Sequence, residues 1–360
     1  MVDLQSQYQQ IKETVDNSIQ EVLNSSTYIN GPAVQEFQAD LENYLNVKHV
    51  IPCANGTDAL QIAMMALGLE QGDEIITADF TFAATVEVIA LLKLTPVLVD
   101  VDAKTFNIDI EALKKAITPK TKAIVPVHLF GQVANMDAVM EIAKEHNLFV
   151  IEDNAQAIGA DYTFEDGTTQ KAGTIGNVGT TALAHTIRGI VNHGMYERYY
   201  HDVVGVNSRL DSIQAGVLQA KLPNLDGYCD ARRNAARFYN NALANNPNII
   251  TPSAKSNKTK NCNAICDVCD CHVFHQYTLQ ITNGKRDELH KHLLENGIPN
   301  AIYYPVALHS QKAYADAKYK EEDFPVTNNL IKTVISLPMH TELDNEQLEF
   351  ITKTIIGFLK

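Results

Sequence analysis

Short apolar segments alternate with amphipathic segments through the first half of the chain. The apolar runs are DEIITAD at 73–79, PVLVDVD at 96–102, KAIVPVHLF at 122–130 and LFVIED at 148–153, and the stretches between them have helical spacing at 84–92, 110–117 and 136–145. Short buried strands that alternate with helices are typical of βαβ units with right-handed crossovers. The pattern predicts an α/β fold with a mostly parallel sheet flanked by helices.

The two ends of the chain have a different pattern. Residues 3–24 and 34–45 have apolar positions at roughly helical spacing, and HVIPCANGTDAL at 49–60 predicts a short strand that changes to a helix at Gly56. Beyond residue 225 come a long helical stretch at 230–244, apolar runs at 274–281 and 333–340, and helical stretches at 287–297 and 345–359. We expect an N-terminal helical segment (1–30), a large α/β domain (31–225), and a linking helix with a smaller C-terminal α+β domain (226–360).

Composition narrows the classes of partner. With 360 residues, 45% of them hydrophobic, the chain can bury a large core. A formal net charge of −14 disfavours nucleic acid or an anionic membrane as the main partner. No run approaches the ~20 apolar residues of a membrane span, and the first residues lack a signal-peptide core. These features predict a cytoplasmic protein whose six cysteines stay reduced.

Two stretches place polar groups where ligands gather. The run LFVIEDNAQAIGA at 148–160 delivers Glu152, Asp153 and Gln156 to the carboxyl end of a buried strand, where open α/β sheets bind their ligands. Asp153 could serve chemistry there, or it could simply cap a following helix. Gly56 and Thr57 open a helix whose free N–H groups favour an anion, although a plain turn with Thr57 as cap also fits.

Five motifs together resemble one family. They are EDNAQAIGA at 152–160, ANGTDALQIAM at 54–64, DFTFAAT at 79–85, VHLFGQVANMD at 127–137 and GVNSRLDSIQAGVL at 205–218. In this order they resemble the DegT/StrS-type sugar aminotransferases, pyridoxal-phosphate enzymes that aminate keto-sugars carried on nucleotides. The resemblance implies a fold type I large domain and a homodimer with shared sites.

The same resemblance implies a role for each matching residue. Asp153 would keep the pyridine nitrogen of the cofactor protonated, and Gln156 would contact the ring hydroxyl side. The remaining matches are Gly56, Thr57 and Asn207 (from the second subunit) for the cofactor phosphate, Phe82 for stacking on the ring, and Arg209, Tyr303 and Tyr304 for the sugar. Without the resemblance, Phe82 fits a core aromatic, and NSRLD at 207–211 fits a helix start with Ser208 as cap and Asp211 at the third position.

The implied reaction is amino transfer, with glutamate as donor, to the 3- or 4-keto carbon of a nucleotide-linked sugar. The motifs at 54–64 and 205–211 favour members that act on 3-keto sugars, including those that make 3-amino uronic acids for surface polysaccharide. Members acting on a 3-keto uronate carry His-Tyr before the proline, where this chain has Tyr303-Tyr304-Pro305.

One part of the family pattern is missing. After GTT at 179–181 the family continues through a strand, a lysine-bearing turn and a second strand, whereas here Thr181 is followed directly by Ala182. By resemblance roughly two dozen residues are absent, including two internal strands and the Schiff-base lysine. Between Asp153 and Arg188 only Lys171 remains, in a polar hairpin typical of solvated surface residues.

The gap leaves three possibilities. The chain could be a shortened aminotransferase, or a non-catalytic homologue that binds cofactor or nucleotide sugar or pairs with an active relative. The gene could also encode the missing stretch, which sequencing across codons 175 to 190 would show.

A cysteine-rich stretch near residue 265 is a separate candidate for chemistry. Thiols and imidazoles are ligands for zinc or an iron-sulfur cluster, and this stretch holds Cys262, Cys266, Cys269, Cys271, His272 and His275. The usual two-knuckle spacing is lacking, and an odd composition is tolerated in a loop. We expect little or no bound metal.

Overall fold

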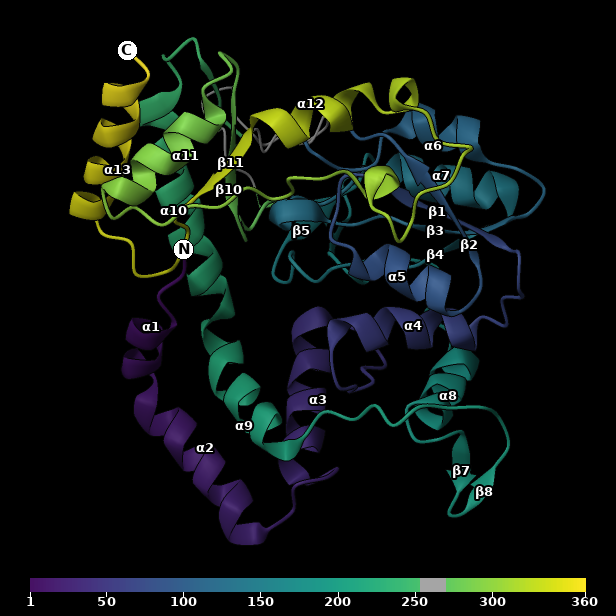
Figure 1. Cartoon of the computed structure of the whole chain (residues 1–360). Helices are drawn as coiled ribbons and strands as arrows, with labels where there is room; N and C mark the ends of the chain where they lie inside the picture. Colours follow the sequence, from purple (N-terminus) through teal and green to yellow (C-terminus); the bar gives the residue numbers. More distant parts are fainter. Residues whose placement is uncertain (253–269) are drawn as a thin grey trace.

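The computed structural model describes residues 1–252 and 270–360 of the chain (Figure 1). Its main sheet has four parallel strands in the order β2-β1-β3-β4. The strands are β1 (Glu74–Ala78), β2 (Thr95–Val99), β3 (Thr121–Val125) and β4 (Phe149–Val150). Their positions match the apolar runs of the sequence, so the predicted parallel sheet is confirmed.

Helices cover both faces of this sheet. On one face Ile76 and Ile124 pack into a core with α6 (Ile110–Ala116) and α7 (Met136–His146). On the other face their neighbours Ile75 and Ala123 pack with α4 (Gly56–Ala66) and α5 (Ala84–Leu91). Alternate residues of a strand point to opposite faces, which explains why these strands are apolar without a break.

The free edge of β4 is covered by the loop 173–177. The side chain of Asn177 accepts a hydrogen bond from Val150 N (2.8 Å) and donates one to Leu148 O (2.9 Å), as a neighbouring strand would. The loop lies so close that a Cβ at Gly176 would stand 2.5 Å from the Val150 carbonyl oxygen. A side chain and a loop thus satisfy the backbone hydrogen-bonding groups at this edge of the sheet.

The predicted strand at 49–53 is absent, and this prediction was wrong. The segment runs as an irregular chain, with Val50 N bonded to the carboxylate of Glu42 (2.9 Å) rather than to a strand. A strand forms only when a partner supplies its ladder of hydrogen bonds. The apolar residues of this segment do not indicate whether a neighbouring strand is present to pair with it.

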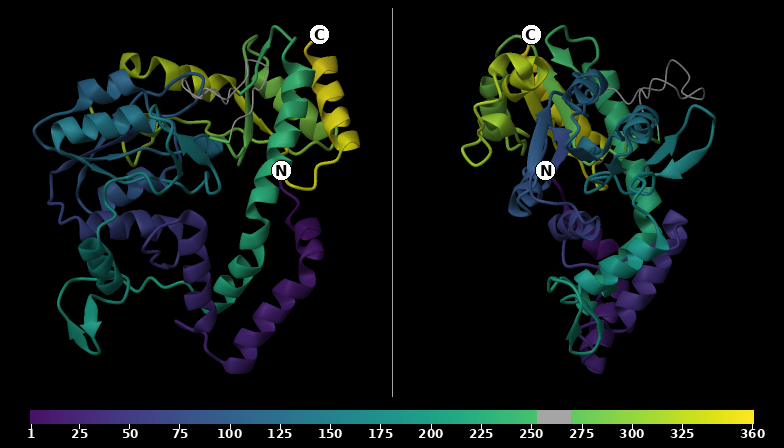
Figure 2. Two further views of the ribbon diagram at one scale, coloured as in Figure 1. Left: turned by 180° about the vertical axis from the view of Figure 1, so that it is seen from behind. Right: turned by 90° about the vertical axis from the view of Figure 1, so that its right-hand side faces the viewer.

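The N-terminal helices pack against the helices that follow the main sheet. Helices α2 (Lys12–Ser25) and α3 (Pro32–Leu45) both contact α9 (Ser212–Lys221), and α10 (Leu225–Leu243) continues from α9 toward the C-terminal part of the chain (Figure 2). Asp211 is the N-cap of α9, accepting from Gln214 N at 2.8 Å. The alternative helix start with Ser208 as cap is therefore wrong, because the Ser208 hydroxyl instead accepts from Ala54 N.

The C-terminal part is an antiparallel sheet in the order β11-β10-β9, with its own core. Its elements are β9 (Ile249–Ile250), β10 (Tyr277–Ile281), α11 (Arg286–Glu295), α12 (Pro325–Thr333), β11 (Val334–Leu337) and α13 (Asn345–Phe358). The other α-helices and strands of the described residues are α1 (Leu4–Gln10), β5 (Asp161–Thr163), β6 (Thr169–Lys171), α8 (Thr181–Ile190), β7 (Met195–Glu197) and β8 (Tyr200–His201). None of the helices in the described ranges is long and apolar enough to cross a membrane.

Candidate active site

Asp153 lies at the carboxyl end of the main sheet, just beyond β4. Its backbone continues the pairing with the β3 side, since Asp153 N donates to Pro126 O (2.9 Å) and His128 N donates to Asp153 O (3.0 Å). The side chain is 9% exposed, and its Oδ2 accepts a hydrogen bond of 2.7 Å from the hydroxyl of Thr85. Oδ1 accepts from Ala155 N at 3.2 Å, which leaves it a further lone pair.

Thr85 was not among the predicted site residues. It lies in the first turn of α5, is fully buried, and meets Asp153 from 68 positions away in the chain. Thr85 belongs to the motif at 79–85, but neither local pattern nor spacing identifies its partner.

Aromatic side chains cluster near this carboxylate. The ring of Phe82 is 59% exposed, so it is not the core aromatic that its pattern alone allowed. Its centroid lies 6.3 Å from that of Tyr304, which also stacks on Phe130 at 6.5 Å. Burial raises the pKa of Tyr304 to about 12, despite a hydrogen bond with Gln156 that lowers it. Gln156 also accepts from Phe130 N at 2.6 Å, so the predicted residues Phe82, Gln156 and Tyr304 meet in one group.

A buried hydrogen-bonded pair, Asp79 and His309, holds the segment that follows Tyr303 and Tyr304. Asp79, at the end of β1, accepts from the backbone N of His309 (2.7 Å) and contacts its Nδ1 (2.7 Å). Both side chains are buried, and the imidazole stacks on Phe324 at 4.4 Å. This pair joins residues 230 positions apart and was not predicted.

The first turn of α4 is open. Asn55 caps it by accepting from Asp58 N at 2.9 Å, and a Cβ added at Gly56 would meet nothing within 4 Å. Gly56 is exposed and Thr57 half-buried, so their N–H groups and the Thr57 hydroxyl are accessible. An open helix N-terminus with a free hydroxyl suits an anion such as a phosphate.

The segment 205–211 lies beside this turn in the same chain. The hydroxyl of Ser208 accepts from Ala54 N at 3.0 Å, two residues before Gly56. Asn207 is exposed, and Arg209 donates to the side chain of Asn192 at 3.0 Å.

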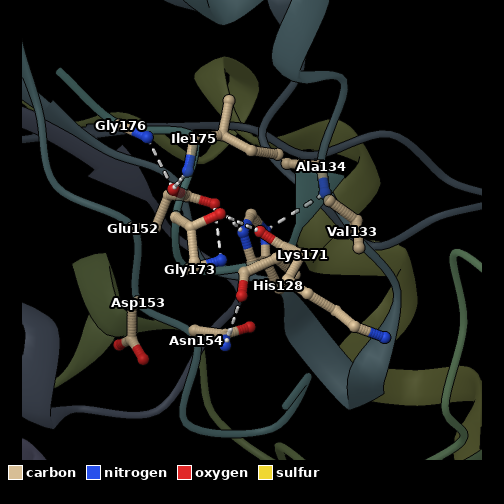
Figure 3. Close-up of polar contacts among 12 residues, drawn as sticks. His128, Val133, Ala134, Glu152, Asp153, Asn154, Lys171, Gly173, Ile175 and Gly176 are labelled. Carbon is tan, nitrogen blue, oxygen red and sulfur yellow. Dashed lines mark hydrogen bonds and ion pairs between the residues drawn. The ribbon is translucent and has the colours of Figure 1, made fainter. Parts of the chain in front are cut away.

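Lys171 is not near Asp153. Its Nζ forms an ion pair with Asp161 at 3.0 Å and lies over the ring of Tyr44 at 5.1 Å. Figure 3 shows the amine pointing away from Asp153. The prediction of a solvated surface lysine was wrong in part, because the side chain is only 22% exposed and is held by these neighbours.

The donor set fits most of a pyridoxal phosphate. A buried carboxylate for the pyridine nitrogen, an exposed aromatic ring and an open helix turn for phosphate are present. The resemblance expects the amine that would hold the aldehyde between 172 and 188, where the sequence contains no lysine.

The metal hypothesis concerns a part of the chain that is mostly outside the described residues. Cys262, Cys266 and Cys269 lie there, and within 1–252 and 270–360 no group of three potential ligands could hold a metal ion. Cys271 is disulfide-bonded, so the prediction that all six cysteines stay reduced is wrong for this residue. A disulfide depends on two thiols lying close together, which the redox compartment alone does not predict.

Comparisons with known proteins give one consistent result. The sequence profile described as the DegT/DnrJ/EryC1/StrS aminotransferase family matches residues 9–183 and 180–356, in two pieces that meet at 180–183. The chain is 40% identical over 367 residues to the UDP-2-acetamido-2-deoxy-3-oxo-D-glucuronate aminotransferase of Pseudomonas aeruginosa, covering 97% of each chain.

Two further similarities extend this result. The chain is 41% identical to the pleiotropic regulatory protein of Geobacillus stearothermophilus, covering all of this chain and 98% of that one. That alignment spans 379 positions, more than the 360 residues of the chain. The crystal structure of DesV from S. venezuelae in complex with a ketimine intermediate matches with a TM-score of 0.89 and 31% identity, covering 100% of this chain and 98% of that one.

Proposed function

The chain belongs to the DegT/DnrJ/EryC1/StrS aminotransferase family, and from this premise we propose that its site binds pyridoxal 5′-phosphate and a nucleotide-linked keto-sugar. The family reaction would be amino transfer from glutamate to the sugar. We further propose that this chain binds these molecules but is inactive, or severely impaired, in turnover. The observation that carries the proposal is the buried Asp153 at the sheet end, together with Phe82 exposed beside Tyr304 and a sequence without lysine from 172 to 188.

When bound, the cofactor supplies an electron sink that stabilises a carbanion on the reacting carbon. Asp153 would accept a hydrogen bond from the protonated pyridine nitrogen, and the hydroxyl of Thr85 would hold that carboxylate in place. Phe82 would stack on the ring, Gln156 would contact its hydroxyl side, and the first turn of α4 at Gly56 and Thr57 would hold the phosphate.

Loss of the lysine would stop the proton transfers of the cycle. The profile match that breaks at 180–183 and the alignment that outruns the chain both support an internal gap after Thr181. A positioned acid/base group typically contributes about 10²- to 10⁴-fold in rate. Without an amine beside the reacting carbon, the chain would lose at least that factor and also the covalent attachment of the cofactor.

We propose a 3-keto sugar as substrate, because the Pseudomonas aeruginosa relative is named for a 3-oxo sugar. Arg209, Tyr303 and Tyr304 would face the sugar. The Tyr304 ring packs between Phe82 and Phe130, and Tyr303 lies beside it; both are half-buried. A tyrosine in place of histidine at 303 alters the groups available to a substrate carboxylate, which bears on a uronate as substrate.

A homodimer is part of the proposal. Asn207 is exposed rather than folded back onto the phosphate turn, as expected if it reaches a second copy. The hairpin β7–β8 projects from the body of the protein (Figure 1), and Tyr199 and Val204 in and after it are 75% and 86% exposed. Apolar residues so exposed on an arm fit an isologous contact between two copies. Sedimentation should show a dimer at micromolar concentration, and a monomer alone would contradict shared sites.

Titration of the protein with pyridoxal phosphate, followed by absorbance, tests the cofactor proposal. We expect saturable binding that Asp153→Asn and Phe82→Ala weaken, while the exposed control Asp166→Asn leaves it unchanged. Incubation with glutamate and a UDP-linked 3-keto sugar should then give little or no amino sugar. Binding that none of the site variants affects would refute the assignment of the site.

A further inference from the structure

Glu152, next to Asp153, has a side chain that is almost completely buried and does not face the proposed cofactor. Its carboxylate accepts from four donors: His128 Nε2 (2.9 Å) and the backbone N–H groups of Gly173 (2.8 Å), Ile175 (2.5 Å) and Gly176 (2.6 Å) (Figure 3). The side chain is 3% exposed, and that of His128 is 0% exposed. Both oxygens are therefore committed.

The hydrogen bonds define the protonation of this pair. His128 Nδ1 accepts from Ala134 N at 3.2 Å, so the ring carries its hydrogen on Nε2 and donates it to Glu152. A carboxylate surrounded by donors alone is held in its ionised form. Burial by itself would raise the pKa of Glu152, but the hydrogen bonds from His128, Gly176 and Gly173 outweigh it and lower that pKa below its ordinary value.

The carboxylate joins two parts of the protein that meet at the edge of the main sheet. On one side lies His128, whose backbone N also bonds Asp153 O. On the other side lies the loop 173–177, which covers the free edge of β4. The chain stays extended just beyond β4, where Asp153 forms an isolated parallel bridge with Val127. Successive residues of an extended chain point to opposite sides, so anchoring Glu152 on one side sets the direction of Asp153 on the other, toward Thr85.

We propose that Glu152 and His128 are a positioning pair for Asp153, a buried carboxylate and imidazole that fix the end of β4 and so aim the Asp153 carboxylate at the pyridine nitrogen. The effect of this pair on cofactor binding rests on the proposed function. Its effect on the chain beyond β4 does not depend on any ligand. Sheets with a strand on each side hold such a position by backbone pairing, whereas here the side chains of Glu152 and Asn177 bind the segments on this edge.

The test compares Glu152→Gln with the exposed control Glu111→Gln by amide hydrogen exchange of the whole protein. The side-chain NH₂ of Gln would be a fifth donor in a site that already holds four donors, so at least one N–H loses its acceptor. We expect the amides of His128, Asp153, Gly173, Ile175 and Gly176 to exchange about thirty-fold faster, or roughly 2 kcal/mol. Amides of β10 and β11 should be unchanged.

Two substitutions of His128 separate its two hydrogen bonds. His128→Gln keeps a donor near Nε2 for Glu152, whereas His128→Asn keeps an acceptor near Nδ1 for Ala134 N. The proposal predicts that the Asn variant loosens the Asp153 amide more than the Gln variant does. It also predicts that Glu152→Gln weakens pyridoxal-phosphate binding about tenfold and shifts the absorbance of the bound cofactor.

Faster exchange confined to these amides supports the positioning role, and so does weaker, spectrally shifted cofactor binding. Uniform acceleration across β10 and β11, or no change in the local amides, overturns it, as does unaltered binding by Glu152→Gln. Should the unsubstituted protein bind no pyridoxal phosphate, the proposed function fails, and the exchange result alone decides whether Glu152 positions Asp153.

Discussion

Asn177 takes the place of a neighbouring strand at the edge of the main sheet, so its removal should cost more than that of an ordinary loop asparagine. Asn177→Ala deletes both the acceptor for Val150 N and the donor to Leu148 O. Val150 is fully buried, in the central core of the large sheet. The substitution leaves its backbone N–H without a partner.

The magnitude follows from these two hydrogen bonds. Each contributes about 0.5–1.5 kcal/mol net, and a buried N–H left unmade costs about 1–3 kcal/mol. A recess of about 600 Å³ is lined by Leu148, Phe149 and Asn177. Water in this recess can bind the carbonyl of Leu148 in the variant, which reduces the free-energy cost of losing that hydrogen bond. We expect Asn177→Ala to lower the free energy of unfolding by about 2 kcal/mol.

Urea denaturation of the variant and of the exposed control Asn245→Ala checks this value, with the midpoints compared at equal slopes. Asn177→Asp is a second comparison, because it keeps an acceptor for Val150 N but places an oxygen against Leu148 O. Asn177→Asp should lower the free energy of unfolding by at least as much as Asn177→Ala does. A loss for Asn177→Ala no greater than that of Asn245→Ala would refute the idea that this side chain completes the sheet edge.

Three other changes have defined outcomes. Thr85→Val should weaken pyridoxal-phosphate binding about tenfold, the equivalent of one hydrogen bond to a charged group, while Thr85→Ser retains it in the same absorbance titration. Burial lowers the pKa of His272 to about 3, so the unfolded chain binds the extra proton below its ordinary pKa and stability falls as pH drops from about 6.5. The free energy of unfolding should fall by roughly 2 kcal/mol between pH 6.5 and pH 5, at about 1.4 kcal/mol per pH unit. His272→Asn should reduce this pH dependence when denaturation is measured at the same two pH values. Elemental analysis of protein purified without chelator should find little or no zinc or iron; stoichiometric metal that disappears in Cys266→Ser and Cys269→Ser would contradict this.

The alternation of apolar runs and helical stretches predicted the parallel sheet because each strand is buried on both faces. It did not predict the short length of β4 or the irregular chain at 49–53. Both depend on which strand pairs with the segment, and this cannot be predicted from the sequence of that segment alone.

The site followed a similar division. The positions of Asp153 and Gln156 at the end of a strand could be predicted from local sequence, whereas the role proposed for Phe82 came only from the family resemblance. Thr85 with Asp153, and Asp79 with His309, are pairs separated by 68 and 230 positions, and only the packed fold brings them together. Glu152 lies in a predicted motif, but its partners are His128, 24 positions away, and three backbone N–H groups that no side-chain pattern identifies.

We propose that this chain keeps a cofactor site of its family without the lysine that completes the cycle. Borohydride reduction of the protein with bound pyridoxal phosphate is the direct test, followed by peptide mass mapping and an assay for glutamate-dependent amination. We expect no phosphopyridoxyl adduct concentrated on any single lysine and no amination above background. An adduct on one specific lysine, Lys171 included, together with amination of a keto-sugar nucleotide, would contradict it.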